Sequence, residues 1–335
     1  MSARIVVIGG DGIGPEVVGA AVKVLEATGV EVDLGFYEAG DEVAERGGQP
    51  LPDATLEAAR AADAVLFGAA GRSAADVILR LRKELNCYAN IRPSRAFKGV
   101  KCLHPECDLV VVRENTECLY IGLEARLTPD VATATRLITR KASTRIARRG
   151  FEMAAARERK RLTAVHKANV MRITDGLFLE ACREVARDFP QVEYEEALVD
   201  SVAMRMVLDP GQFDVLLTTN LFGDILSDLA AGLIGGLGLC PSANLGEGPG
   251  LFEPVHGSAP DIAGKGIANP TAAILCVAMM LEHMGWTRQG LAVHKAVEAC
   301  LAQGMVTPDL GGKLTTMEMA REVASVTRQL LASGS

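Results

Sequence analysis

The sequence has few aromatic residues and no excess of positive charge. Aromatic residues make up 4% of the 335 residues, with one Trp and four Tyr, so platforms of stacked rings for bases are not expected. The formal net charge is -7, which argues against a nucleic-acid binder that works through a global positive field. A role in binding DNA or RNA is therefore disfavoured.

Long apolar runs and a disulfide framework are also missing. No apolar run reaches the roughly 18 residues of a membrane span, and the first residues, MSARIVVIGGDG, contain no signal-peptide core. The eight cysteines are scattered, as is typical of buried thiols in a reducing compartment. Cys102, His104 and Cys107 are crowded and lack a second CxxC pair, which disfavours a zinc site. We expect a cytoplasmic protein without membrane or nucleic-acid partners.

Buried strands alternate with helical segments along the chain, which predicts an α/β fold. The runs RIVVI at 4–8, AVLFG at 64–68, DLVVV at 108–112 and FDVLLT at 213–218 have the composition of buried strands. The first run leads into a glycine turn with GxGxG spacing and Pro15 in place of a third glycine. This pattern favours a tight strand-to-helix turn near a cofactor over a Rossmann phosphate loop.

Two carboxylates lie four residues apart in the apolar stretch LTTNLFGDILSDLAAGLIGGLG at 217–238. On a helix, Asp224 and Asp228 would project from one face with side chains about 5–6 Å apart. Two such carboxylates repel each other unless a cation lies between them, and Mg²⁺ or Mn²⁺ prefers oxygen ligands of this kind. The alternative is that one Asp caps the helix while the other is solvated.

Three arginines, Arg82, Arg92 and Arg113, lie at or near the ends of predicted elements. Arginine binds carboxylates through two parallel hydrogen bonds and stays charged. Each alone would ordinarily be a surface residue. Together with Tyr120, Lys167 and the aspartates, they suit a small polycarboxylate held beside a metal.

Six motifs make the chain resemble the metal-dependent β-decarboxylating dehydrogenases, the family of isocitrate, 3-isopropylmalate and homoisocitrate dehydrogenases. They are GDGIGPEV at 10–17, LRKELNCYANIRP at 81–93, VRENTECLY at 112–120, HKANVMRITDGLFLE at 166–180, FGDILSD at 222–228 and HGSAPDIAGKGIANP at 256–270. The resemblance implies a two-domain α/β fold with a mixed, largely parallel sheet, distinct from the Rossmann fold. It further implies a large domain from 1–90 and 237–335 with the nucleotide loop. A small domain at 91–236 would hold the metal helix and an arm, at about 120–140, that clasps a homodimer.

The resemblance also implies a role for each matching residue. Arg82, Arg92 and Arg113 would hold substrate carboxylates, and Tyr120 would return a proton to the product enol. The metal ligands would be Asp224 and Asp228, with Asp200 completing the shell from the other subunit. Lys167, also from that subunit, would act with Asp200 to accept the hydroxyl proton.

Cofactor choice is indicated by Asp261, which follows the HGSAP run. An acid here can accept hydrogen bonds from ribose hydroxyls and repels a 2′-phosphate, so NAD is expected. The resemblance implies that the nucleotide is seated by His256, Gly257, Ser258, Ala259, Asp261, Ile262 and Asn269.

Substrate choice rests on two opposing signals. Ile78 and Leu79, four and three residues before Arg82, form an apolar pair that suits an isopropyl group. The segments 166–186, 209–216 and 227–238 look more like NAD-dependent isocitrate and homoisocitrate enzymes. Arg72, Ser73 or Arg80 could then meet a distal carboxylate. On balance, the sequence favours conversion of isocitrate to 2-oxoglutarate and CO₂, a tricarboxylic acid cycle reaction, with homoisocitrate and 3-isopropylmalate as alternatives.

A non-catalytic regulatory subunit is the alternative from another functional class. It is disfavoured because all five residues that the chemistry needs are present: Tyr120, Lys167, Asp200, Asp224 and Asp228.

Overall fold

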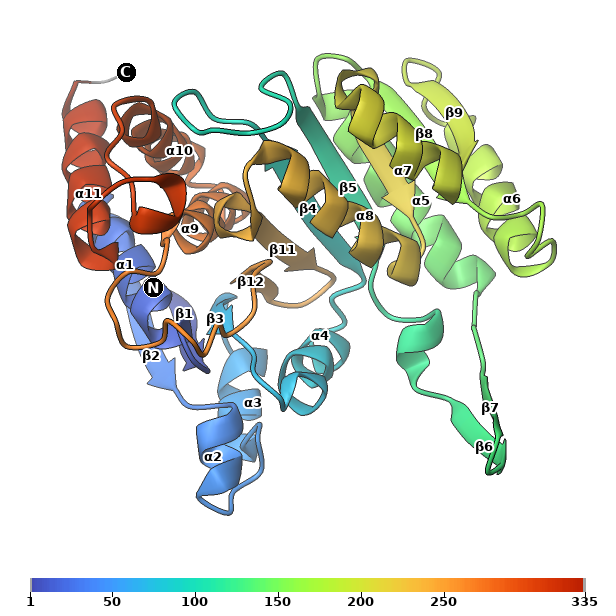
Figure 1. The fold of residues 1–335 in the computed structure, drawn as a ribbon, viewed down its shortest axis with the longest axis horizontal. Helices are drawn as coiled ribbons and strands as arrows, with labels where there is room; N and C mark the ends of the chain where they lie inside the picture. The colour runs from blue at the N-terminus through green and yellow to red at the C-terminus, as the bar shows by residue number, and fades with distance from the viewer. Residues whose placement is uncertain (1, 334–335) are drawn as a thin grey trace. The chain divides into compact units, whose positions relative to one another are not determined.

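The computed structural model describes residues 2–333 and divides the chain into two compact units (Figure 1). Unit 1 contains the segment up to Cys87, the loop Ala96–Pro105 and the segment from Ile234 onward. Unit 2 contains Tyr88–Arg95 and Glu106–Leu233. The chain therefore starts and ends in unit 1 and builds unit 2 from its middle.

Unit 1 contains a five-stranded array in the order β2-β1-β3-β12-β11. Its strands are β1 (Ala3–Gly10), β2 (Val32–Tyr37), β3 (Ala64–Ala69), β11 (Pro241–Leu245) and β12 (Gly250–Pro254). β1 pairs in parallel with β2 and β3, β12 pairs in parallel with β3, and β11 runs antiparallel to β12. β3, β11 and β12 are buried along their whole length, as expected for strands covered on both faces.

Helices cover the strands of unit 1. They are α1 (Gly14–Ala27), α2 (Asp41–Glu45), α3 (Asp53–Arg60), α4 (Arg80–Glu84), α9 (Thr271–His283), α10 (Thr287–Ala302) and α11 (Thr316–Ala332), with short turns η1 (Ala75–Leu79), η4 (Leu237–Leu239) and η5 (Pro308–Leu310). α9 packs against α1, α10 and β12, and α11 packs against α1 and α10 (Figure 1). α9 is apolar almost all round, which is typical of a helix buried among other elements.

Unit 2 contains a second array in the order β4-β5-β10-β8-β9. Its strands are β4 (Ala89–Arg95), β5 (Asp108–Glu114), β8 (Arg161–His166), β9 (Glu193–Leu198) and β10 (Val215–Thr218). β5, β10, β8 and β9 are parallel neighbours, and β4 runs antiparallel to β5. The carboxyl ends of the parallel strands thus lie along one edge, where ligand sites of α/β proteins form.

The helices of unit 2 are α5 (Arg140–Ala156), α6 (Thr174–Ala186), α7 (Val199–Leu208) and α8 (Asn220–Ile234), with short turns η2 (Leu119–Ile121) and η3 (Pro210–Gln212). The arm predicted near 120–140 contains an antiparallel hairpin, β6 (Glu124–Thr128) and β7 (Val131–Ala134), in which every residue is exposed. Figure 1 shows this hairpin projecting from the rest of unit 2.

The prediction of an α/β fold with a mixed, largely parallel sheet is confirmed. Among the described residues, no helix is both long and apolar enough to cross a membrane. The glycine turn after β1 leads straight into α1, with Pro15 in its first turn, where a missing backbone N–H costs nothing.

Candidate active site

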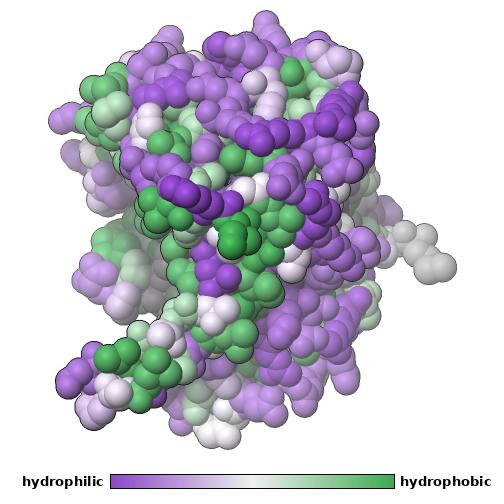
Figure 2. All heavy atoms as spheres, turned by 90° about the vertical axis from the view of Figure 1, so that its right-hand side faces the viewer, coloured by the Kyte–Doolittle hydropathy of each residue, from purple (hydrophilic) through white to green (hydrophobic). Residues whose placement is uncertain are grey.

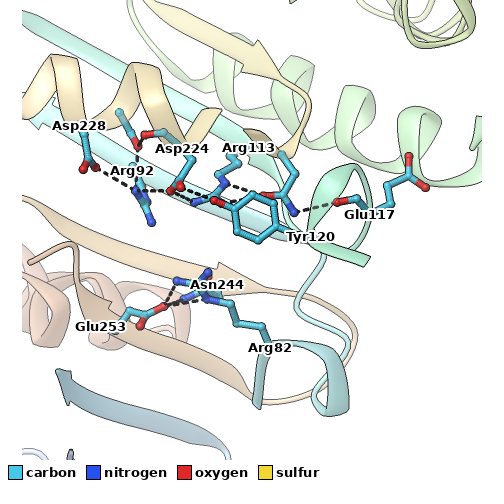
Figure 3. A network of polar contacts seen from close by, with 11 residues as sticks. Arg82, Arg92, Arg113, Glu117, Tyr120, Asp224, Asp228, Asn244 and Glu253 are labelled. Carbon is cyan, nitrogen blue, oxygen red and sulfur yellow. Dashed lines mark hydrogen bonds and ion pairs between the residues drawn. The ribbon is translucent and has the colours of Figure 1, made fainter. Parts of the chain in front are cut away.

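Asp224 is the centre of a polar cluster in unit 2. It lies on α8, which begins two residues after the fully buried strand β10. One carboxylate oxygen accepts a hydrogen bond from the Arg113 guanidinium, and the other accepts one from the Tyr120 hydroxyl. Figure 3 shows the three side chains converging from β5, η2 and α8. The structure thereby brings together residues far apart in the sequence that were all predicted to act in catalysis or binding.

Arg113 is held in place by Asn220. Its Nε and Nη2 donate to Asn220 Oδ1 at 3.0 and 2.7 Å, and the Asn220 amide donates to the Glu117 carbonyl at 3.2 Å. The Arg113 side chain is 1% exposed. Gly223 allows this approach, because a Cβ there would lie 2.2 Å from Thr218 Oγ1 and 2.6 Å from Arg113 Cγ. Asn220 and Gly223 were not identified as site residues, although both belong to the predicted metal stretch.

Arg92 enters the same cluster from β4. Its Nη1 lies 3.5 Å from carboxylate oxygens of both Asp224 and Asp228, and donates to Ser227 Oγ at 2.8 Å. The side chain is 8% exposed. One face of α8 therefore presents two carboxylates to two nearly buried guanidinium groups.

Burial shapes the protonation of this cluster. Burial, followed by the hydrogen bond to Asp224, raises the pKa of Tyr120, so its hydroxyl keeps its proton at neutral pH. Burial also raises the pKa of Asp228, and the nearby Asp224 carboxylate adds to this, while Arg92 opposes it. Asp224 and Asp228 supply carboxylate oxygens four residues apart, and the ionised form of Asp228 is disfavoured in the absence of a cation. These features fit a divalent cation such as Mg²⁺ or Mn²⁺.

Lys167 and Asp200 form a separate pair in unit 2. Lys167 Nζ donates to Asp200 Oδ1 at 2.5 Å, and this bond lowers the pKa of the carboxyl group. Within residues 2–333, no three His, Cys, Asp or Glu side chains of one chain group closely enough to hold a metal. Asp200 is thus not brought to Asp224 and Asp228 within a single chain.

Arg82 belongs to unit 1 and has an acidic partner there. Its Nε and Nη2 donate to Glu253 Oε1 at 3.0 and 2.7 Å, and Asn244 Nδ2 donates to the same oxygen at 2.7 Å (Figure 3). Arg82 and Glu253 are 9% and 8% exposed. The sequence analysis missed Glu253. Its signal was an acid inside the otherwise apolar β12 run GLFEP.

The segment before Arg82 is helical as predicted, but its first turn, η1, is a π-helix. A π-turn changes the angular spacing, so residues three and four positions before Arg82 need not share its face. Ile78 is 6% exposed and packs into the apolar core of unit 1, with Leu79 packed against that core and only partly buried. Of the predicted substrate-contacting pair, Leu79 retains exposed surface.

The loop 256–270 of unit 1 contains an unsatisfied nitrogen. His256 Nε2 is buried without a hydrogen-bond partner, and burial lowers the pKa of the imidazole, which favours its neutral form. Both polar atoms of the Asn269 side chain already have partners within the chain. Its Oδ1 accepts a hydrogen bond from the Thr271 N–H at 3.0 Å, and its Nδ2 donates one to Asp309 at 2.9 Å. A buried nitrogen without a hydrogen-bond partner, in the same loop as the exposed Asp261, fits a loop that takes a polar ligand such as a nucleotide.

The chain is similar to known proteins along nearly its whole length. The family model for isocitrate/isopropylmalate dehydrogenase matches residues 4–323. The chain is 58% identical to 3-isopropylmalate dehydrogenase from Archaeoglobus fulgidus, over 96% of this chain and 99% of that protein. It is 51% identical to isocitrate/homoisocitrate dehydrogenase from Thermus thermophilus, over 98% and 100%.

A solved structure shows the same fold. The crystal structure of isocitrate dehydrogenase from Methylococcus capsulatus aligns with a TM-score of 0.94 at 48% identity, covering 98% of this chain and 100% of that one. The chain belongs to the isocitrate/isopropylmalate dehydrogenase family of decarboxylating hydroxyacid dehydrogenases.

Proposed function

We propose that the protein oxidatively decarboxylates 3-isopropylmalate, or a closely related 3-alkylmalate, with NAD and a divalent metal ion. The observation that carries the reaction type is the cluster of Asp224, Asp228, Arg92, Arg113 and Tyr120 in unit 2. It combines anionic oxygens for a metal, guanidinium groups for carboxylates and a hydroxyl that keeps its proton.

The choice of an alkylmalate over a tricarboxylate is supported by the arginines near Arg82. A third carboxylate would need a further polar partner, and Arg72, Ser73 and Arg80 were the candidates. Arg72 instead pairs with Asp41 and Glu45, and Arg80 with Asp53 and the Leu51 carbonyl. The partly exposed, apolar Leu79 suits an alkyl group. These contacts favour the alternative of the sequence analysis over its preference for isocitrate.

The comparisons support the same choice. Identity is 58% to a protein named for 3-isopropylmalate, against 51% and 48% to proteins named for isocitrate or homoisocitrate. Isocitrate and homoisocitrate remain the second candidates, because these similarities are also extensive. A non-catalytic regulatory role is disfavoured, since the proposed catalytic side chains are present and Tyr120 lies in hydrogen-bonding contact with Asp224.

The proposed mechanism assigns each proton to a side chain. Arg92, Arg113 and Arg82 bind the substrate carboxylates. Lys167 and Asp200 would take up the C2 hydroxyl proton together, with Lys167 passing an Nζ proton to the Asp200 carboxylate as it accepts the hydroxyl proton, and a bound nicotinamide would accept the hydride from C2. Bound at Asp224 and Asp228, with Asp200 of a second subunit, the metal would polarise the C2 oxygen. The C3 carboxylate then departs as CO₂, and Tyr120 donates a proton to C3 of the enol.

NAD is proposed over NADP on the basis of Asp261. Its exposed carboxylate can accept hydrogen bonds from ribose hydroxyls, and it would repel a 2′-phosphate. His256, through its unpaired Nε2, Gly257, Ser258, Ala259 and Ile262 are proposed to line the nucleotide. Asn269 would contribute through its backbone and its remaining amide N–H.

A homodimer is proposed because unit 2 exposes large apolar side chains. They include Leu127 and Val131 on the arm, and Ile173, Met204, Leu208 and Ile225 at or on its helices. Figure 2 shows apolar side chains gathered in a band on the face that carries α6 and α7 in Figure 1. Gathered apolar surface of this kind marks interaction sites. A second copy would also supply Lys167 and Asp200 to the active site.

A cytoplasmic location is proposed from the cysteines. All eight are free thiols and seven are buried, which suits a reducing compartment.

The proposal is tested by following NADH formation with Mg²⁺ on 3-isopropylmalate, 3-methylmalate, isocitrate and homoisocitrate. We expect kcat/KM for 3-isopropylmalate to exceed that for either tricarboxylate by at least about 100-fold, because a buried, unpaired carboxylate is strongly rejected. A preference for isocitrate would overturn the substrate assignment while leaving the reaction type intact. The variant Leu79→Ser should lower the preference for the isopropyl group.

A further inference from the structure

Arg136 lies outside every motif assigned above, yet it connects the segments that carry the proposed catalytic groups. It follows the arm hairpin and is 12% exposed. Its Nε donates to Cys118 Sγ at 3.3 Å and its Nη2 to Thr219 Oγ1 at 3.1 Å. Its Nη1 donates to Asp175 Oδ1 at 2.5 Å and to Thr174 Oγ1 at 2.8 Å. Four of its five N–H groups are therefore used, on three separate segments.

Asp175 extends this network to Lys167. Its side chain is fully buried, and its Oδ2 accepts a hydrogen bond from the backbone N–H of Lys167 at 2.5 Å. The two oxygens of one carboxylate thus join the Arg136 guanidinium to the turn that presents the proposed base. A buried carboxylate with two charge-assisted or backbone donors is strongly fixed in position.

Cys118 extends the network toward Tyr120. Its backbone forms an antiparallel bridge with Leu137, next to Arg136, and its φ of 72° is rare for a residue with a side chain. Such a conformation persists only where surrounding contacts hold it. The contact of Arg136 with Sγ and the bridge to Leu137 supply those contacts two residues before Tyr120.

Thr219 and Phe222 complete the connection to α8. The Arg136 guanidinium lies over the Phe222 ring, 5.4 Å from its centre, in addition to its bond with Thr219. Thr219 immediately precedes α8 and Phe222 lies in its first turn, five and two residues before Asp224. One guanidinium therefore touches the segments that lead to Tyr120, Lys167 and Asp224.

We propose that Arg136, together with Asp175, is a positioning residue that holds Tyr120 and the start of α8 for the active site of its own chain and Lys167 for the active site of the second subunit. This inference rests on the proposed function, which makes those residues the proton donor, the base and the metal-binding helix. A misplacement of any one of these groups by about 1 Å can lower a rate by about 100-fold.

The decisive variants are Arg136→Lys and Asp175→Asn. Lysine keeps the ion pair with Asp175 but cannot reach Cys118 and Thr219 at the same time. Asparagine can accept from Arg136 or from the Lys167 N–H, but not from both. We expect kcat to fall by about 10- to 100-fold in each variant, with KM for the hydroxy acid changed by less than about 3-fold.

The control is Arg140→Lys. Arg140 lies four residues along the chain and makes exposed ion pairs with Glu180 and Glu184. We expect this variant to keep full activity, because exposed pairs contribute little. If Arg136→Lys keeps the wild-type kcat, whether or not its melting temperature falls, Arg136 is at most a structural residue and the proposal fails.

Hydrogen exchange provides a readout that does not depend on turnover. In Arg136→Lys and Asp175→Asn, exchange should accelerate at 116–121 and at 166–171, while the body of α5, 144–156, stays protected. Acceleration confined to 134–138 would overturn the positioning role even if the enzyme proved inactive on every hydroxy acid. Activity of the wild-type enzyme tests the proposed function separately.

Discussion

Tyr120 and Arg113 share the carboxylate of Asp224: the hydroxyl donates to one oxygen and the guanidinium to the other. Arg113 also lies over the Tyr120 ring, 5.0 Å from its centre. The side chains proposed as proton donor, substrate-binding cation and metal ligand thus contact one another in a single chain. We therefore expect substitutions in this cluster to change catalytic rate and metal affinity.

Replacing Tyr120 with Phe removes the proposed proton donor but keeps the ring under Arg113. We expect kcat to fall by about 100- to 1,000-fold, because general acid catalysis contributes about that much, with KM nearly unchanged. The control is Tyr194→Phe, which removes a hydroxyl bonded to Glu196 on β9. Steady-state kinetics on 3-isopropylmalate measure both. Equal activity of Tyr120→Phe and wild type would remove Tyr120 from the mechanism.

Asp228→Asn separates stability from activity. The pKa of Asp228 is raised above its ordinary value, so its ionised form costs folding free energy at neutral pH, and this cost disappears as pH falls below the ordinary value. The metal-free variant should therefore melt above wild type at pH 7 and approach it near pH 3–4. Mn²⁺ affinity and kcat/KM should each fall by at least about 100-fold. A lower melting temperature at pH 7 would contradict the assigned cause.

Cofactor preference should depend on Asp261. Asp261→Arg removes an acceptor for ribose hydroxyls and adds a partner for a 2′-phosphate. We expect kcat/KM for NAD to fall by about 10- to 100-fold and that for NADP to rise. Initial rates with each nucleotide at saturating hydroxy acid measure the change. An unchanged NAD/NADP ratio would show that Asp261 does not contact the ribose.

Glu16 is expected to support the nucleotide loop. From α1, it accepts hydrogen bonds from the backbone N–H groups of Gly266 and Ala268 at 3.3 and 3.0 Å, and from Thr316. Glu16→Gln can satisfy only part of this set, so NAD should bind about 3- to 10-fold more weakly. Calorimetry measures the binding directly, and the exposed Glu26→Gln on the same helix is the matched control. Equal NAD affinity in both variants would contradict the role.

The sequence predicted the α/β class, most of the strands and the grouping of Asp224, Arg113 and Tyr120, because strand ends and helical spacing are local properties that fix where side chains emerge. It did not predict β11 and β12, which lie in a stretch rich in glycine and turn residues. It did not reveal Glu253 beside Arg82, or Asp41 and Glu45 beside Arg72, since these partners are distant in the chain and a lone acid carries no pairing signal. The π-turn before Arg82 was missed for a similar reason, because its residues form an ordinary helical pattern.

The most direct test of the central claim is the yield of NADH and CO₂ from 3-isopropylmalate by the wild-type protein. With Mg²⁺ we expect one CO₂ for each NADH, loss of both products after treatment with EDTA, and recovery on addition of Mn²⁺. NADH without CO₂, or turnover that survives complete removal of metal, would contradict a metal-dependent oxidative decarboxylation at Asp224 and Asp228.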